Sequence, residues 1–251
     1  MSKEEIERFA KGLKRTNMDF ESQWLAKFSR HLDETVGEEI RRKVMQGDEK
    51  LLASGDQQEI ADWTKEAMDR LDALVDEKNR RRVMTGCACH FPEKRLLAVR
   101  AKYEETRDLD VVHKMLRELF VSDLRNVLKL DEKLIKKIVN WGWGVAGMRE
   151  GNKIIATKMP FEFEEYLNAT DPQEKRYRYC HCPRIREIIR SSGPRITSTY
   201  CYCGAGFYKG IWEKILQRPV KVEVLETVLN GSDVCRIAIH LPSEVRHTRK
   251  R

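Results

Sequence analysis

Long apolar runs are missing from this sequence of 251 residues. No stretch approaches the roughly 18 uninterrupted apolar residues that a membrane-spanning helix needs. The opening letters, MSKEEIERFAKG, carry too many charges for a secretory signal peptide. Long polar tracts are missing as well, which argues against wholesale disorder. The sequence therefore predicts a globular, cytoplasmic protein with no membrane attachment.

Several common catalytic motifs are also missing. The chain has no Gly-x-x-x-x-Gly-Lys-Ser/Thr loop, no Gly-x-Ser-x-Gly elbow, no His-Glu-x-x-His helix and no Gly-x-Gly-x-x-Gly after a strand. These absences argue against nucleotide hydrolysis, serine hydrolysis and dinucleotide-dependent redox chemistry.

Basic residues outnumber acidic ones in only part of the chain. Lys and Arg number 48 against 40 Asp and Glu, a formal charge of +8, but residues 1–86 hold 17 basic and 19 acidic side chains. The excess lies further on and includes a basic tail at residues 243–251. A solvated tail is the simpler interpretation, so we do not expect nucleic acid as a partner.

Hydrophobic periodicity predicts two different halves. Over residues 3–82 apolar side chains recur at helical spacing, as in Phe20, Trp24, Phe28 and Leu32, and helical stripes continue to about residue 140. Beyond that point residues 153–159 and 220–225 read as strands, and residues 234–241 as an antiparallel partner. Helices are expected at residues 183–191 and 204–217.

The expected fold class is therefore α+β, with an all-helical N-terminal half and a C-terminal antiparallel sheet that has helices on one face. We expect a helical region at residues 1–140, an α+β domain at 141–242 and the basic tail at 243–251.

Six of the seven cysteines form three Cys-x-Cys pairs, which is the strongest chemical signal. Two of these pairs each directly precede an expected helix, where the helix dipole lowers the pKa of a thiol and favours the thiolate that a metal needs. Four thiolates match the tetrahedral site of zinc, with iron as the alternative. The predicted ligands are Cys180, Cys182, Cys201 and Cys203, with Cys87, Cys89 and Cys235 as possible additions.

Other roles for these thiols stay open. A reactive or redox cysteine and a small buried hydrophobe both fit the same residues. His90 and His181 adjoin cysteine pairs and could each replace a sulfur ligand, although a solvent-facing or capping imidazole is the simpler interpretation.

The runs CYCGAGFYKGIWEKIL at residues 201–216 and VKVEVLETVLNGSDVCRIAI at residues 220–239 resemble the 4-vinyl-reductase-like domain. That family has a cysteine before a small-residue helix start, a strand ending in Glu-Thr or Glu-Ser, and a Gly-Asp-x-x-Cys turn into its last strand. The matching positions are Cys203, Gly206, Glu226, Thr227, Gly231 and Cys235. The resemblance implies an α+β domain that binds small hydrophobic molecules, in sensors, enzymes or accessory proteins, sometimes with cysteine-bound metal.

Two functions follow as expectations. The first is a metal-binding, small-molecule-binding or sensory protein, whose partly apolar ligand is lined by aromatic side chains; ordinary core packing is the alternative for each of them. The second is a hydrolase of a small substrate that uses a cysteine thiolate or a metal-activated water, with Cys203 and Glu226 as catalytic candidates. Glu226 could equally pair with an arginine. The aromatic candidates are Trp141, Trp143, Tyr202, Tyr208 and Trp212.

Overall fold

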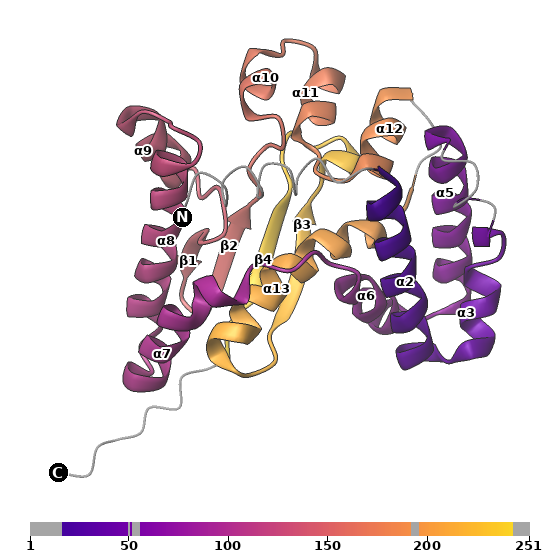
Figure 1. Ribbon diagram of the computed structural model, residues 1–251, viewed down its shortest axis with the longest axis horizontal. Helices are drawn as coiled ribbons and strands as arrows, with labels where there is room; N and C mark the ends of the chain where they lie inside the picture. The colour runs from indigo at the N-terminus through magenta and orange to yellow at the C-terminus, as the bar shows by residue number, and fades with distance from the viewer. Residues whose placement is uncertain (1–16, 50, 52–55, 192–195, 243–251) are drawn as a thin grey trace. The chain divides into compact units, whose positions relative to one another are not determined.

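The computed structural model describes residues 17–49, 51, 56–191 and 196–242, and the chain divides into two compact units (Figure 1). The first unit comprises Met1–Ala88, Met159–Gly206 and Glu226–Val234. The second comprises Cys89–Lys158, Phe207–Leu225 and Cys235–Arg251. The domain boundary expected between residues 140 and 141 lies inside the second unit, and the expected basic tail lies outside the described residues.

The first unit is helical. Its N-terminal segment holds α2 (Asn17–Val36), α3 (Glu38–Val44), α5 (Gln57–Leu74) and α6 (Glu77–Gly86). Asp56 caps α5, since its carboxylate accepts the backbone N–H groups of Gln58 and Glu59. The expected apolar stripe of α5 is confirmed, because Ile60 and Leu71 are among its buried residues. Helix α2 packs against α3 and α6, and α5 packs against α3.

The remaining segments of the first unit add α10 (Phe163–Asn168), α11 (Pro172–Tyr179), α12 (Pro183–Ser191) and the short 3-10 turns η2 (Ser198–Cys201) and η3 (Val228–Asn230). The sequence predicted α12 but neither α10 nor α11. Helix α12 packs against both α11 and α5, so it joins segments that are far apart in the chain.

The second unit combines helices with the sheet. Its helical elements are η1 (Glu93–Leu96), α7 (Leu97–Thr106), α8 (Leu109–Asn126) and α9 (Glu132–Asn140). Asp131 caps α9, because its carboxylate accepts the N–H of Leu134. Helix α13 (Tyr202–Leu216) begins in the first unit and continues in the second.

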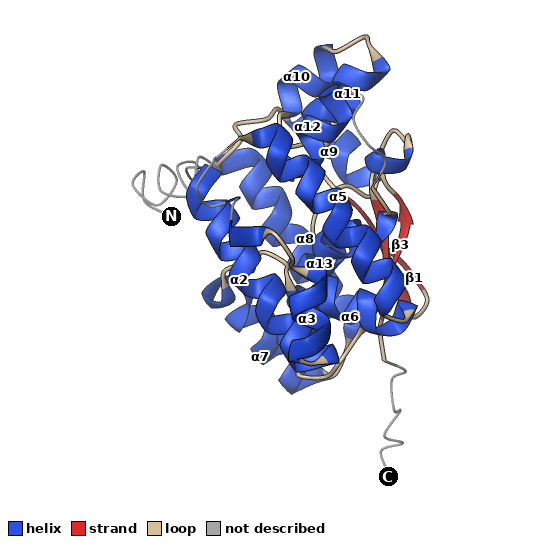
Figure 2. Ribbon diagram, turned by 90° about the vertical axis from the view of Figure 1, so that its right-hand side faces the viewer, coloured by secondary structure: helices blue, strands red, loops and turns tan. Residues whose placement is uncertain are grey.

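The sheet contains β1 (Met148–Glu150), β2 (Lys153–Thr157), β4 (Arg236–His240) and β3 (Lys221–Glu226), in that spatial order. Antiparallel pairing places Ile154 opposite Ile239 and Ala156 opposite Ile237, and all four side chains are buried on one face. Figure 2 separates the helices in blue from the strands in red, and every described element before β1 is a helix. The α+β class, with its helical N-terminal half and C-terminal antiparallel sheet, is confirmed.

The helices have one further property that bears on the expected absence of a membrane span. Within the described part of the chain, none is both long enough and apolar enough to cross a bilayer.

Candidate functional site

Within the first unit, cysteines of all three pairs lie at or near helix ends. Cys87 is the C-terminal cap of α6, and Cys180 is the C-terminal cap of α11. Cys182 directly precedes α12, as expected. Cys203 instead lies inside the first turn of α13, because the turn η2 runs straight into that helix.

Cys182 has polar groups on several sides. Its Sγ lies 3.2 Å from the hydroxyl of Tyr200, and either atom can donate the hydrogen bond. The backbone N–H of Ile185 also interacts with this sulfur, while the Cys182 carbonyl accepts the N–H of Arg186 at 2.9 Å. The ring of Tyr200 stacks on that of Trp24, with centroids 5.6 Å apart. The thiol and the hydroxyl are therefore held in fixed positions.

Arg184 is fully buried beside this pair. Its Nε donates to Glu21 Oε2 at 2.8 Å, its Nη2 donates to the same oxygen, and its Nη1 donates to Thr64 Oγ1 at 3.3 Å. The guanidinium carbon lies 4.0 Å from the centroid of the Trp24 ring and 5.8 Å from that of Trp63. Ion pairing and two cation–π contacts thus compensate for burial of this charge. We call this group the Arg184 cluster; its members are Glu21, Trp24, Trp63, Thr64, Cys182, Arg184 and Tyr200.

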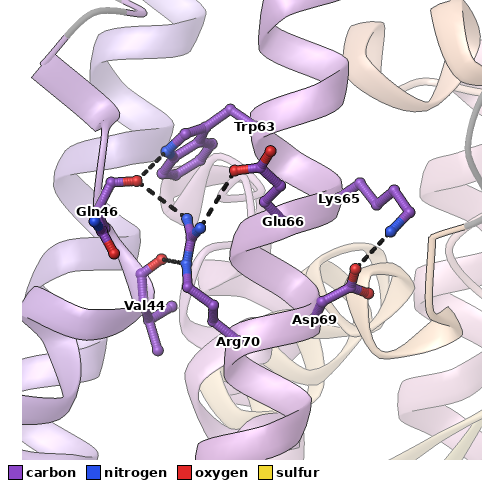
Figure 3. Close-up of polar contacts among 7 residues, drawn as sticks. All are labelled: Val44, Gln46, Trp63, Lys65, Glu66, Asp69 and Arg70. Carbon is purple, nitrogen blue, oxygen red and sulfur yellow. Dashed lines mark hydrogen bonds and ion pairs between the residues drawn. The ribbon is translucent and has the colours of Figure 1, made fainter.

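The two tryptophans of the cluster differ in their hydrogen bonding. The indole N–H of Trp63 donates to the carbonyl of Gln46 at 3.0 Å, and Arg70 binds the same carbonyl at 3.1 Å and that of Val44 at 3.0 Å (Figure 3). Arg70 thereby satisfies carbonyls at the C-terminal end of α3, which a helix leaves unpaired. The indole N–H of Trp24, in contrast, is buried without a hydrogen-bond partner among the described residues.

Glu21 resembles Trp24 in its hydrogen bonding. Its Oε2 binds Arg184, but its Oε1 is buried and has no hydrogen-bond partner in the described part of the chain. Glu21 and Trp24 both contact the guanidinium of Arg184, so an unpaired acceptor and an unpaired donor lie in one cluster. Buried polar atoms are almost always hydrogen-bonded in folded proteins. Both atoms can therefore bond to a partner beyond the described residues, such as buried water or a ligand.

Two thiols of the first unit, Cys182 and Cys87, have pKa values raised above the ordinary value by their surroundings. Burial raises the pKa of Cys182, and this effect outweighs the lowering by Tyr200, by the Ile185 N–H and by Arg184. Burial also raises the pKa of Cys87, with a further contribution from Cys203. The expectation that a helix N-terminus makes Cys182 a thiolate is corrected here, because desolvation dominates.

Cys87 and Cys203 meet where α6 ends and α13 begins. The Cys203 thiol donates to the Cys87 carbonyl at 3.5 Å, and the Cys87 thiol donates to the carbonyl of Val83 at 3.3 Å. The backbones approach closely here, since a Cβ built on Gly206 would lie 2.1 Å from the carbonyl oxygen of Thr85. The fold thus brings together one cysteine from each of two pairs.

The predicted metal site has no preformed geometry. Over the described ranges, no three Cys, His, Asp or Glu side chains are arranged to hold a metal ion. His181, a possible replacement ligand, has its Nε2 2.7 Å from the carbonyl oxygen of Met159. The Cys180, Cys182, Cys201 and Cys203 thiols do not form a ligand set as they lie, and zinc binding stays a prediction.

The aromatic side chains predicted to line a ligand site are divided between the two units. Trp141 and Trp143 belong to the second unit, with ring centroids 5.1 Å apart; Trp143 is buried, whereas Trp141 is 49% exposed. Tyr208 and Trp212 also belong to the second unit and are buried on α13, whereas Tyr202 lies in the first unit beneath the guanidinium of Arg81. No described contact joins all five around one centre.

The catalytic candidates are also distributed over different elements. Glu226 is half-buried at the end of β3, and Cys203 is half-buried in the first turn of α13. Cys235 is half-buried before β4 and belongs to the second unit. There burial, with a further contribution from Cys235, raises the pKa of the Tyr208 hydroxyl. The Arg184 cluster is one polar centre that the structure assembles among the described residues.

Comparison with known proteins adds one match. Residues 166–246 match a family of unknown function, DUF6144. No curated protein and no solved structure matches the chain. The matched segment includes Cys182, Arg184 and Tyr200 but not Glu21 or Trp24, and its description names no activity or ligand. The resemblance to the 4-vinyl-reductase-like domain stays a prediction.

Proposed function

We propose that this protein binds a small, uncharged, polar molecule at the Arg184 cluster. The observation that carries the proposal is the unpaired state, among the described residues, of Glu21 Oε1 and Trp24 Nε1, two buried atoms beside one guanidinium. Each unsatisfied buried group costs about 1–3 kcal/mol. A ligand that donates to the carboxylate oxygen and accepts from the indole N–H removes that cost.

The charges of the cluster favour an uncharged ligand. Arg184 and Glu21 form an ion pair, and both are buried, so their charges already compensate each other. A charged ligand would leave a net charge in this buried region, which is energetically unfavourable. The rings of Trp24 and Tyr200 add apolar surface beside the polar atoms. The proposed ligand is therefore small and partly apolar, with at least one donor and one acceptor.

The test uses full-length protein and Trp24→Phe, which removes the N–H and keeps an aromatic ring. Small molecules released by denaturing the purified protein are identified by mass spectrometry. We expect a molecule at close to one per wild-type chain, and affinity reduced by about tenfold in the variant, as the loss of one buried hydrogen bond predicts. Trp141→Phe, at an exposed ring of the second unit, is the control and should retain the molecule.

Two results would contradict this function. One is equal retention of the molecule by the Trp24→Phe and wild-type proteins. The other is a crystal structure in which ordered water alone pairs Glu21 Oε1 and Trp24 Nε1, because buried water satisfies such atoms without any ligand.

Zinc remains a second proposal. It is supported by the contact of Cys203 with Cys87, and by the proximity of Cys182 and Cys203 to Tyr200, whose pKa both thiols raise. A structural site predicts about one metal per chain in protein purified without added metal, and reduced thermal stability after chelation. Cys203→Ser should lower the metal content, whereas Cys235→Ser, in the other unit, should not. Elemental analysis that finds neither zinc nor iron would exclude this proposal.

A further inference from the structure

The exposed side of helix α9 is rich in lysine. Ile135 and Ile138 are buried on one side of this helix, and the side chains on the opposite side are exposed. Spacings of three and four residues bring these exposed side chains onto one surface, with Trp141 at its C-terminal edge. We call this surface the lysine face; its members are Lys133, Lys136, Lys137, Asn140 and Trp141.

The positive charges of the lysine face are not neutralised within the described part of the chain. None of its three lysines forms an ion pair with a described residue. The acidic side chains that precede them are already engaged. Asp131 accepts the N–H of Leu134, and Glu132 binds a guanidinium, that of Arg125, at 2.5 and 2.9 Å. In the segments of the second unit up to residue 242, Lys and Arg number 20 against 12 Asp and Glu, so the wider field also attracts anions.

Trp141 adds an aromatic ring to these charges. It is 49% exposed, whereas the neighbouring Trp143 is buried, and their ring centroids lie 5.1 Å apart. The backbone N–H of Trp141 donates to the carbonyl of Lys137 at 2.9 Å, which closes the last turn of α9. The ring is therefore held at the edge of the lysine face by a fixed backbone and a buried neighbour.

We infer that the lysine face binds single-stranded nucleic acid, with phosphates at the lysines and a base stacked on Trp141. Cationic groups beside an aromatic ring are how proteins hold single strands without reading their sequence. Stacking on the ring needs an unpaired base, which a duplex does not present. The inference goes beyond the proposed function, because the Arg184 cluster belongs to the first unit and α9 to the second.

Two other anionic partners fit this face less well. A helix that binds a bilayer inserts its apolar side, but Ile135 and Ile138 of α9 are buried within the protein. A stable protein interface buries about 800 Å² on each partner around an apolar centre. The lysine face is one side of a helix of 9 residues, with polar side chains beside a single ring.

The charge pattern of the sequence argued against nucleic acid for reasons that do not apply to α9. Those reasons were the nearly neutral charge of residues 1–86 and the solvation expected of the basic tail. Helix α9 lies in neither segment. The structure adds that its lysines share one exposed face and have no ion-pair partner among the described residues.

The first test measures the salt dependence of binding. A fluorescein-labelled thymidine oligonucleotide is titrated with the full chain, and anisotropy is recorded between about 50 and 200 mM salt. Three lysine–phosphate contacts contribute about −2 to the slope of log K against log salt for a single strand. The triple variant Lys133→Gln, Lys136→Gln, Lys137→Gln should therefore lose about that much of the slope.

A charge-matched triple variant is the control. It replaces with glutamine three lysines of the second unit that already pair with carboxylates, so the net charge changes equally. Its slope should change by less than about half a unit, because ion-paired lysines release few counterions. The replaced lysines are Lys102, Lys114 and Lys214. Equal loss of slope in both triple variants would contradict a site on α9.

Trp141 is tested by a change that leaves the charge unaltered. Trp141→Ala should weaken binding of the oligonucleotide about tenfold and leave the salt slope unchanged, because it removes stacking and no cation. Trp141→Phe keeps an aromatic ring and should retain most of the affinity. Equal losses in the two variants would show that stacking is not involved.

Two results on the wild-type protein would overturn the inference without any variant. One is equal affinity for the single strand and for a duplex of the same length, which would leave only a general attraction to phosphate. The other comes from photo-cross-linking with an oligonucleotide that carries bromodeoxyuridine, followed by peptide mass spectrometry. We expect cross-links within residues 132–143, and cross-links confined to other parts of the chain would place the strand elsewhere.

Discussion

Replacing Arg184 by methionine should lower the free energy of unfolding by about 3–5 kcal/mol. The change leaves the carboxylate of Glu21 buried without the guanidinium that binds its Oε2, and it removes the cation from between Trp24 and Trp63. Methionine can fill much of the arginine's volume, so the loss of charge compensation dominates. Urea unfolding followed by circular dichroism measures the difference.

Two further variants distinguish loss of the ion pair from a general effect on α12. Arg190→Met alters an exposed arginine on the same helix and should change stability by less than about 0.5 kcal/mol. Glu21→Leu combined with Arg184→Met removes both charges and should be more stable than Arg184→Met alone, because no unpaired charge stays buried. If the double variant is no more stable than the single one, burial of an unpaired carboxylate is not the cause.

Periodicity alone was enough to predict the longer elements of this fold. Helices α2 and α5 each bury a continuous stripe of apolar residues, and β4 was predicted to within a few residues. Helices α10 and α11 gave no such pattern, because each buries a single residue, Tyr166 and Tyr179. Strand β1 is only three residues long and presents an exposed Met148. Elements that bury one side chain leave no periodic signal.

The sequence pointed to the cysteines of the candidate site but not to its charged pair. A signal was present, since Arg184 precedes the buried Ile188 by four residues and Glu21 precedes the buried Leu25 by four, which places both charges on apolar faces. No spacing rule shows that these two residues meet, because 163 positions separate them. The pairing comes from the packing of distant helices and needs the structure.

The protonation of Cys182 was predicted in the wrong direction for a related reason. Position at a helix start is readable from the sequence, and its effect on the thiol has the expected sign. The extent of burial is not readable from a Cys-x-Cys pair, and burial decides the net direction here. The burial of Cys87, whose thiol donates to the carbonyl of Val83, was not readable from its pair either.

Substituting alanine at two glycines of α13 should have effects of opposite sign. A Cβ at Gly206 would lie 2.1 Å from the carbonyl oxygen of Thr85 and 2.8 Å from the Cβ of Ala88, so the two backbones must separate. Such overpacking costs about 1–3 kcal/mol. A Cβ at Gly210 meets nothing within 4 Å, so Gly210→Ala should gain up to about 1 kcal/mol from helix propensity. Thermal unfolding of the two variants makes the comparison.

The contrast matters because Gly206 sets how closely the start of α13 approaches the end of α6, where Cys203 donates to the Cys87 carbonyl. Separation of the backbones in Gly206→Ala should lengthen this contact and let solvent reach the Cys87 thiol, which is buried in the wild-type protein. Its pKa should then fall toward the ordinary value, since burial is the main cause of its rise. Alkylation of Cys87 at pH 8 should therefore be faster in Gly206→Ala than in Gly210→Ala. Equal rates in the two variants would show that Thr85 and Ala88 adjust without opening the crossing.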